Sequence, residues 1–300
     1  MSLFAPKYYK DFHCIADRCT HSCCVGWEID IDSNSLKKYS ALSGNYATEI
    51  KSSIEGGDPP HFRLGTGDRC PHLDECGLCR IITELGEGYL TDICREHPRF
   101  YIDTARGRFV GVGMACEEAC RIILSSDEYH SFIPVGEYDG EGDVGFDAAP
   151  YINEAYAILL DKSLFYPQRL SALAEGFCAG FSDIPDGEWH SLIGELEYLT
   201  EKDRERFLAY LGDAEVKTEF EAPLTRALAY FIFRHALGAE SYEEFRAGVG
   251  LALFCERLIA SLAAKDADCD FKKLCDIART VSEEIEYSED NTEAIKFTFI

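Results

Sequence analysis

The sequence predicts a mainly α protein, in which a cysteine-rich, metal-stapled N-terminal α+β domain with short strands precedes an all-α helical domain. Ten of the 14 cysteines lie between Cys14 and Cys120. Residues 1–125 hold 14 basic and 18 acidic side chains, whereas residues 126–300 hold 15 and 36. Beyond Pro150, apolar residues recur at three- and four-residue steps, which is the period of helices. We therefore expect a metal-binding domain at 1–130, an acidic linker at 131–150 and a helical domain at 151–300.

The elements expected in the N-terminal domain are short and interrupted by glycine, proline and cysteine. Strands are predicted at 27–31 and 108–112, and helices at 35–54, 78–90 and 115–129. A region with so much loop cannot build a large core, and a bound metal can supply the missing stability. Glycine, proline and acidic residues then cluster over 133–150 without a hydrophobic period, which indicates a linker.

Six helices are expected in the C-terminal domain, over 151–164, 167–181, 189–211, 223–237, 242–264 and 271–287. Pro167 and Pro223 suit first-turn positions, and Ser241 suits a helix N-cap because acidic residues follow it. The acidic excess of this half is expected mainly on solvated faces, where it favours solubility. A second interpretation is that the acidic surface attracts a basic or lysine-bearing partner.

Composition excludes several classes of function for this chain of 300 residues. The net charge of −25 argues against nucleic acid or an anionic membrane as the main partner, because phosphate binding needs clustered lysine and arginine. Residues 1–10 lack the pattern of a signal peptide, and the apolar segments are short, so we expect a cytoplasmic protein without a membrane span. Structural disulfides are rare in the cytoplasm, so 14 cysteines indicate metal binding.

The cysteines form clusters whose spacing leaves the metal open. The first cluster is Cys14-x4-Cys19-x3-Cys23-Cys24, the second is Cys70-x5-Cys76-x2-Cys79, and Cys94 and Cys116-x3-Cys120 follow. Zinc modules usually show paired C-x2-C knuckles, and only one is present here. Iron–sulfur clusters tolerate irregular spacing, so zinc and iron–sulfur both fit. His21 and His72 lie inside these clusters as possible mixed ligands or ordinary polar neighbours, whereas Cys178 and Cys255 suit buried helix faces.

The cysteine clusters belong to longer blocks that resemble the bacterial flagellin lysine-N-methylase family. The blocks follow the family's order: FHC at 12–14, CTHSCCVGWEIDID at 19–32, RCPHLDE at 69–75, GLCRII at 77–82, ELGEGYL at 84–90, ICREHPR at 93–99 and MACEEACRIIL at 114–124. A related, broader group is described as zinc- or iron-chelating. The acidic C-terminal half matches the family only in general character.

The resemblance implies methylation of lysine side chains on flagellin or a similar protein, with S-adenosylmethionine as cosubstrate. It also implies a 4Fe-4S cluster, with zinc as the alternative. The cysteines that match the family, and are the expected ligands, are Cys14, Cys19, Cys23, Cys24, Cys70, Cys79, Cys94 and Cys116. Cys76 and Cys120 are additions, and Glu117 stands where the family has proline.

Familiar S-adenosylmethionine motifs are missing from this sequence. Glycine pairs at 86–88 and 111–113 lack the strand and helix context of a nucleotide-binding turn. The radical-enzyme pattern C-x3-C-x2-C stops at Gly26, where its third cysteine would lie. Any use of this cosubstrate must therefore depend on other residues, in or beside the motif blocks.

Methyl transfer needs a neutral lysine amine, so a nearby group must accept the proton of the ammonium. The candidate acceptors in or beside the blocks are Tyr101, Glu117 and Asp92. Arg95 and Arg99 are candidates for binding the cosubstrate carboxylate, although a structural ion pair is the commoner role of such arginines. Trp27 is a candidate for stacking on adenine, or alternatively a shield for the metal site.

Three functions therefore remain open. The first is a protein-lysine N-methyltransferase that carries an iron–sulfur cluster. The second is a non-catalytic zinc- or iron-chelating module. The third is an interaction protein whose acidic helical half binds a basic partner.

Overall fold

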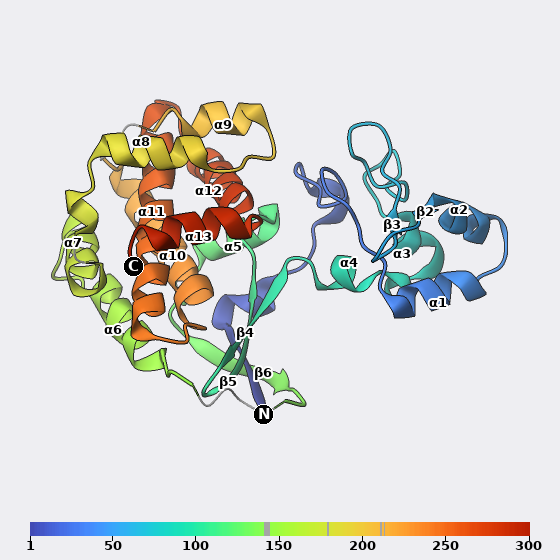
Figure 1. Cartoon of the computed structure of the whole chain (residues 1–300), viewed down its shortest axis with the longest axis horizontal. Helices are drawn as coiled ribbons and strands as arrows, with labels where there is room; N and C mark the ends of the chain where they lie inside the picture. The colour runs from blue at the N-terminus through green and yellow to red at the C-terminus, as the bar shows by residue number, and fades with distance from the viewer. Residues whose placement is uncertain (141–144, 179, 211, 213) are drawn as a thin grey trace. The chain divides into compact units, whose positions relative to one another are not determined.

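The computed structural model describes residues 1–140, 145–178, 180–210, 212 and 214–300 (Figure 1). The chain folds into two compact units. Unit 1 combines Met1–Phe12 with Tyr101–Ile300, and unit 2 is His13–Phe100. This division differs from the expected boundary at 131–150, because the first twelve residues fold together with the last two hundred. The expected domain 1–130 is therefore divided between the units.

Unit 1 contains a four-stranded sheet with the strand order β4-β5-β1-β6. Its strands are β1 (Ser2–Pro6), β4 (Arg99–Thr104), β5 (Gly107–Val112) and β6 (Phe132–Glu137). Strand β1 is parallel to β5 and antiparallel to β6. The strand expected at 108–112 is confirmed as part of β5. The helical half was expected to be all-α, but this sheet packs in the same unit.

Strand β6 shows that part of the expected linker is structured. Phe132 packs edge-on against Phe109, with ring centroids 5.4 Å apart, and lies 5.3 Å from the ring of Phe233 on α10 (Thr218–Ala236). Pairing with the distant N-terminus gives residues 132–137 their hydrogen bonds, and the local glycine and proline pattern cannot reveal it. Residues 141–144 of the expected linker lie outside the described residues.

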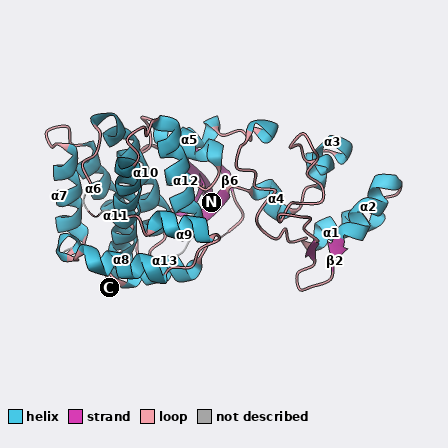
Figure 2. Cartoon of the chain, turned by 90° about the horizontal axis from the view of Figure 1, so that it is seen from above, coloured by secondary structure: helices cyan, strands magenta, loops and turns pink. Residues whose placement is uncertain are grey.

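The helices of unit 1 surround one central helix, α11 (Tyr242–Lys265). The others are α5 (Glu117–Ser125), α6 (Ala149–Leu160), α7 (Tyr166–Phe177), α8 (Asp186–Glu195), α9 (Glu201–Phe207), α10, α12 (Phe271–Glu286) and α13 (Glu289–Phe297). Figure 2 shows α10 and α11 between α6 and α7 on one side and α5 and α12 on the other. Helix α11 alone among the described helices is long and apolar enough to cross a membrane, and 89% of that apolar stretch is buried.

The helices expected at 151–164, 167–181, 223–237, 242–264 and 271–287 are all present, with shifted ends. Ser241 caps α11 by accepting a hydrogen bond from the Glu244 amide at 3.1 Å. The single helix expected at 189–211 is instead α8 and α9, because the chain is extended at Leu196. Pro223 lies inside α10 rather than in its first turn, since the helix begins at Thr218. Helix α13 was not predicted.

Unit 2 is built from short elements around one small apolar core. They are α1 (Ser33–Ala41), α2 (Asn45–Ser53), β2 (Ile54–Glu55), β3 (His61–Phe62), α3 (Arg80–Leu85) and α4 (Asp92–Glu96). The helix expected at 35–54 is broken at Gly44, whose φ of 104° is open to glycine but strained for other residues. The strand expected at 27–31 is wrong, because only an isolated bridge joins Asp30 to His61.

Candidate functional site

Four of the eight expected ligand cysteines meet in the core of unit 2. Cys24, Cys70, Cys79 and Cys94 pack with buried residues such as Tyr39 and Phe62. The Cys70 amide donates to the Cys24 carbonyl at 2.8 Å, which joins the first and second cysteine clusters. Cys79 is the N-cap residue of α3, and Cys94 lies in α4. Segments that are 70 residues apart in sequence thus bring their thiols into one core.

The pKa values of these thiols show that they interact. Burial raises the pKa of Cys70 to about 12 and of Cys94 to about 11, and neighbouring thiols of the set add to both shifts. Burial also raises the pKa of Cys79, again with a contribution from Cys24. In contrast, a hydrogen bond from Cys23 lowers the pKa of Cys24 to about 7 against the effect of burial. A cation among the thiols would relieve the repulsion that disfavours further thiolates.

The donor chemistry of this set suits a soft metal, but its arrangement does not yet form a complete site. Thiolates are the preferred ligands of iron–sulfur clusters and of structural zinc. Within the part of the chain that the structure describes, however, no group of three or more cysteine, histidine or acidic side chains is placed to hold a metal ion. The metal-stapled character of this unit therefore stays a prediction.

The remaining expected ligands lie elsewhere. Cys14 and Cys23 are exposed and Cys19 is partly buried, and the Cys19 thiol donates to the His21 carbonyl at 3.1 Å. Cys116 is the N-cap residue of α5 and belongs to unit 1. Of the eight expected ligands, four therefore pack in the core of unit 2, three more lie in unit 2 outside that core, and Cys116 lies in unit 1.

The other cysteines differ in burial, and His72 is held by hydrogen bonds. Cys120 is buried in unit 1 and its thiol donates to the Cys275 carbonyl at 3.3 Å, whereas Cys76 is exposed. Cys178 and Cys255 are buried, as expected. His72 uses both ring nitrogens in hydrogen bonds, at 3.2 Å to the hydroxyl of Tyr46 and at 3.0 Å to that of Ser53. These contacts make His72 a core residue rather than a metal ligand.

The three candidate proton acceptors lie in different surroundings. Asp92 is exposed at the start of α4 and forms an ion pair with Arg95. Tyr101 is 46% exposed, and the guanidinium of Arg108 lies 5.5 Å from its ring centroid. Glu117 is partly buried in the first turn of α5, directly after Cys116. Asp92 belongs to unit 2, and the other two belong to unit 1.

The candidate cosubstrate residues gather around α4 and Cys23. Arg95 is bound to Asp92, and Arg99 donates to the Arg95 carbonyl at 3.3 Å. The Trp27 indole donates to the Cys23 carbonyl at 2.5 Å, and its ring lies 5.8 Å from that of His97. Burial lowers the pKa of His97 to about 4, so its ring is neutral at pH 7. Trp27 thus lies beside the backbone of Cys23, while Cys14 and Cys23 themselves are exposed.

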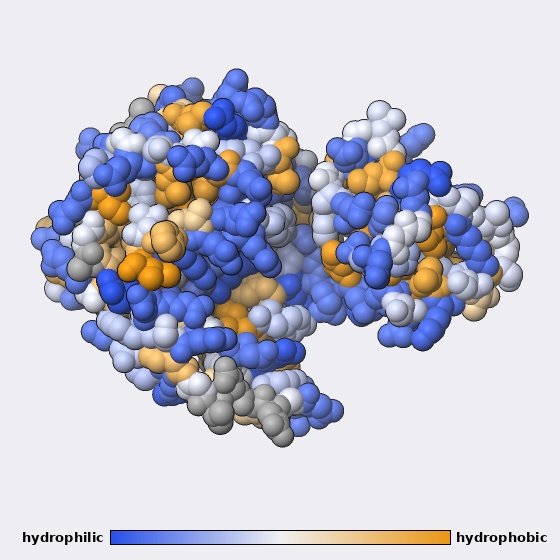
Figure 3. Space-filling view, viewed as in Figure 1, coloured by the Kyte–Doolittle hydropathy of each residue, from blue (hydrophilic) through white to orange (hydrophobic). Residues whose placement is uncertain are grey.

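A buried polar network in unit 1 was missed by the sequence analysis. The Glu286 carboxylate is fully buried and lies 3.0 Å from Nε of Arg234 and 2.7 Å from Nε2 of His235. The hydroxyl of Tyr230 donates to it at 2.9 Å and accepts from the Met114 amide at 3.0 Å, which holds the loop before α5. The acids of this half are thus not confined to solvated faces, although hydrophilic residues cover much of the face of unit 1 in Figure 3.

The sequence does contain a signal for this missed region. Helix α12 has glutamates at 283, 284 and 286 and no basic residue in its last turn. Because the helix dipole disfavours anions at a C-terminus, acids there need compensation from tertiary contacts or from a ligand. Glu286 finds that compensation in Arg234 and His235, whereas Glu284 lines a cleft in the same unit.

Comparisons with known proteins relate part of the chain to flagellar proteins and to lysine methylases. It is 28% identical over 133 residues to the flagellar biosynthetic protein FliU of Salmonella muenchen, a match that covers 41% of this chain and 77% of FliU. It is 27% identical over 131 residues to the lysine-N-methylases of Salmonella choleraesuis and Salmonella typhimurium. Those matches cover 41% of this chain but 32% of each methylase.

No family model and no solved structure matches the chain. The relation to lysine-N-methylases is therefore distant and partial, since the match spans about a third of each methylase.

Proposed function

We propose that this protein transfers methyl groups from S-adenosylmethionine to lysine side chains of flagellin or a similar protein. The observation that carries the proposal is the similarity to two Salmonella lysine-N-methylases. The similarity to FliU adds a flagellar context and favours a flagellin-type substrate. The strongly acidic charge of the chain suits a lysine-bearing partner and disfavours nucleic acid.

We further propose that Cys24, Cys70, Cys79 and Cys94 hold an iron–sulfur cluster. Their shared core and their mutual effect on pKa support this choice of ligands over the scattered cysteines. Such a cluster, when bound, would supply electron transfer. Its free energy of binding would add to the stability of a unit whose apolar core is small.

The residues of this chain must also bind the cosubstrate and free the lysine amine of its proton. Glu117, Tyr101 and Asp92 are the proposed proton acceptors, and Asp92 also forms an ion pair with Arg95. Arg95 and Arg99 are the proposed partners of the cosubstrate carboxylate. Substitution of Glu117 by glutamine preserves its shape and removes its basicity, so it should lower the rate of methyl transfer without releasing the metal.

The test is mass spectrometry of purified flagellin after incubation with the anaerobically purified protein and S-adenosylmethionine. Successive additions of 14 Da (about the mass of one CH2 group) on lysine are expected, and they should be absent without the cosubstrate. The Cys94→Ser variant serves as the comparison for the cluster. If flagellin gains no methyl groups while the wild-type protein retains its metal, the proposal is refuted for this substrate.

A second candidate function is a metal-chelating module without methyl transfer. The match to only 32% of each methylase favours it, because most of the methylase chain has no counterpart in the matched segment. Iron and acid-labile sulfide in the purified protein would support the cluster proposal. A colourless protein with stoichiometric zinc would support the chelating module instead.

A further inference from the structure

Two cysteines of unit 1 that the proposed function does not use lie side by side. Cys120 belongs to α5 and Cys275 to α12, and these two helices pack against each other (Figure 2). The Cys120 thiol donates a hydrogen bond to the Cys275 carbonyl at 3.3 Å. Its sulfur therefore lies against the backbone of Cys275, although 155 residues separate the two in sequence.

The two thiols also interact with each other. Burial raises the pKa of Cys120 well above its usual range, and a hydrogen bond with the Cys275 side chain adds to this shift. Cys116, one turn before Cys120 on α5, contributes less. A thiol that holds its proton this strongly is a poor first nucleophile in disulfide exchange, because the thiolate is the reactive form. Cys120 is therefore suited to react second, with a group already attached to its neighbour.

The exposure of the two cysteines assigns the same order of reaction. Cys120 is fully buried, whereas Cys275 is partly exposed. A small oxidant from solution can thus reach Cys275 but not Cys120. Redox-sensing cysteines commonly combine an accessible thiol with a resolving thiol beside it. Cys275 and Cys120 have this arrangement.

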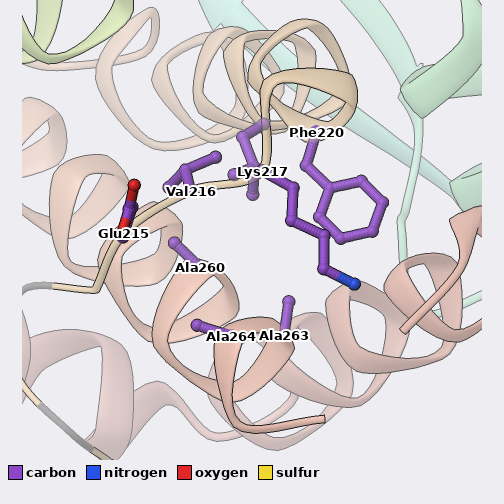
Figure 4. Close-up of a pocket in the computed structure, with 8 residues that line it drawn as sticks. Glu215, Val216, Lys217, Phe220, Ala260, Ala263 and Ala264 are labelled. Carbon is purple, nitrogen blue, oxygen red and sulfur yellow. The ribbon is translucent and has the colours of Figure 1, made fainter. Parts of the chain in front are cut away.

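Other buried cysteines of unit 1 have different neighbours. The Cys178 thiol donates to the Arg246 carbonyl at 3.3 Å, and the Cys269 thiol donates to the Asp270 carbonyl at 3.6 Å. Cys269 lies near a cavity of about 10 Å³ (Figure 4), because Lys217 lines this cavity and donates to the Cys269 carbonyl at 3.1 Å. The cavity holds no more than about one water and is too small for an organic oxidant. These buried thiols are therefore natural controls for the pair.

We propose that Cys120 and Cys275 form a redox-active pair, which a low-molecular-weight disulfide converts into a reversible disulfide bond between α5 and α12. The inference is carried by the hydrogen bond between the two residues, by their unequal exposure and by the packing of their helices. It is independent of the proposed function, because neither thiol belongs to the proposed cluster and no cosubstrate is required. The bond would fasten α5, which begins at Glu117, to α12.

The exchange takes place in two steps. The Cys275 thiolate attacks one sulfur of the small disulfide, which gives a mixed disulfide and releases one thiolate. The Cys120 sulfur then attacks the Cys275 sulfur and releases the second thiolate. The protons of the two protein thiols pass to the released thiolates, so two protein thiols are oxidised while one small disulfide is reduced to two thiols. The bonded sulfurs lie about 2.0 Å apart, and rotation about χ1 is the movement that brings such atoms together.

The experiment incubates the full chain, purified anaerobically, with reduced and oxidised glutathione in a series of ratios. Free thiols are then blocked with iodoacetamide, and tryptic peptides are analysed by mass spectrometry. Trypsin releases peptide 109–121, which contains Cys116 and Cys120, and peptide 274–279, which contains Cys275. We expect these peptides to be joined, with a mass about 2 Da below their sum, and to separate after reduction. At the ratio that joins half of the chains, less than about a tenth of Cys178 and Cys255 should be modified.

Variants identify the cysteines that form the bond. Cys275→Ser and Cys120→Ala should each abolish the cross-link, whereas the matched control Cys116→Ser, on the same peptide, should retain it; circular dichroism checks that all three are folded. A cross-link that Cys116→Ser loses and Cys120→Ala keeps would overturn the assignment to Cys120. The inference is also overturned if the wild-type chain shows no cross-link at ratios that already modify the exposed Cys76, or if Cys116 and Cys120 bond to each other instead.

Discussion

The substitution Glu284→Gln should stabilise unit 1 at alkaline pH. The folded structure raises the pKa of this carboxyl from 4.5 to about 7, chiefly through burial. Between these values the folded chain binds a proton that the unfolded chain has released. The free energy of unfolding therefore falls as pH rises from 4.5 to 7, and then stays low. Glutamine does not titrate, and its carbonyl oxygen can still accept from the Leu199 amide.

The magnitude follows from the size of this shift. A difference of 2.5 pH units corresponds to about 3 kcal/mol at pH 8, and the same linkage leaves about 1 kcal/mol at pH 5. The new amide group loses part of this gain if its N–H bonds stay unpaired, which costs about 1 kcal/mol. We therefore expect a net gain of about 2 to 3 kcal/mol at pH 8 and little change at pH 5.

Urea unfolding followed by tryptophan fluorescence can measure this gain. The chain has two tryptophans, and Trp189 is buried in unit 1 with 1% exposure. A Trp27→Phe background leaves Trp189 as the single reporter of that unit. Glu154→Gln, at an exposed position, is the control and should change stability by less than about 0.5 kcal/mol. A Glu284→Gln variant that is no more stable than its parent at pH 8 would refute the reasoning.

Three further predictions concern the thiols and the packing. Cys94→Ser should lower the bound metal per chain to half or less by elemental analysis, whereas Cys255→Ser should keep it; unchanged metal in the first variant would exclude that ligand. Glu286→Gln should destabilise the chain by about 3 kcal/mol in urea unfolding, because it leaves a buried guanidinium without its counter-charge. Gly248→Ala should cost about 1 to 3 kcal/mol, since its Cβ would lie 2.4 Å from a backbone oxygen of α10. Gly176→Ala, with open space at its Cβ, should instead stabilise α7 by up to about 1 kcal/mol in the same assay, and equal effects would contradict the packing argument.

The helices were the most predictable part of the fold, because each one buries a stripe or an entire surface of apolar residues. Helix α11 is the clearest case, since its apolar residues leave almost no polar face. Strands β1 and β6 were not predicted because each is stabilised by a partner more than a hundred residues away. The helix break at Gly44 was not predicted, because the apolar pattern of residues 35–54 continues through this position.

The sequence predicted which cysteines belong to the candidate site, but not which of them lie close together. Spacing and resemblance selected eight cysteines, yet sulfur atoms from distant segments meet only through the backbone bonds and core packing of unit 2. Cys116 satisfies the same sequence pattern and belongs to the other unit. The three glutamates at the end of α12 were recognisable in the sequence as unfavourable for the helix dipole. Whether each would lie beside an arginine or in an open cleft depended on α10 and on the α8–α9 loop.

The sequence by itself determined the helical character of the C-terminal half, the abundance of thiols in the N-terminal half and the unequal charge of the two. These properties follow from local periodicity and composition, which need no partner segment. Only the tertiary structure decided that Met1–Phe12 joins the helical unit, which four thiols share a core, and that Glu286 lies beside Arg234 and His235 whereas Glu284 lies beside carboxyl groups. The physical reason is that strand pairing, thiol proximity and the desolvation of a carboxylate all depend on residues far away in the chain.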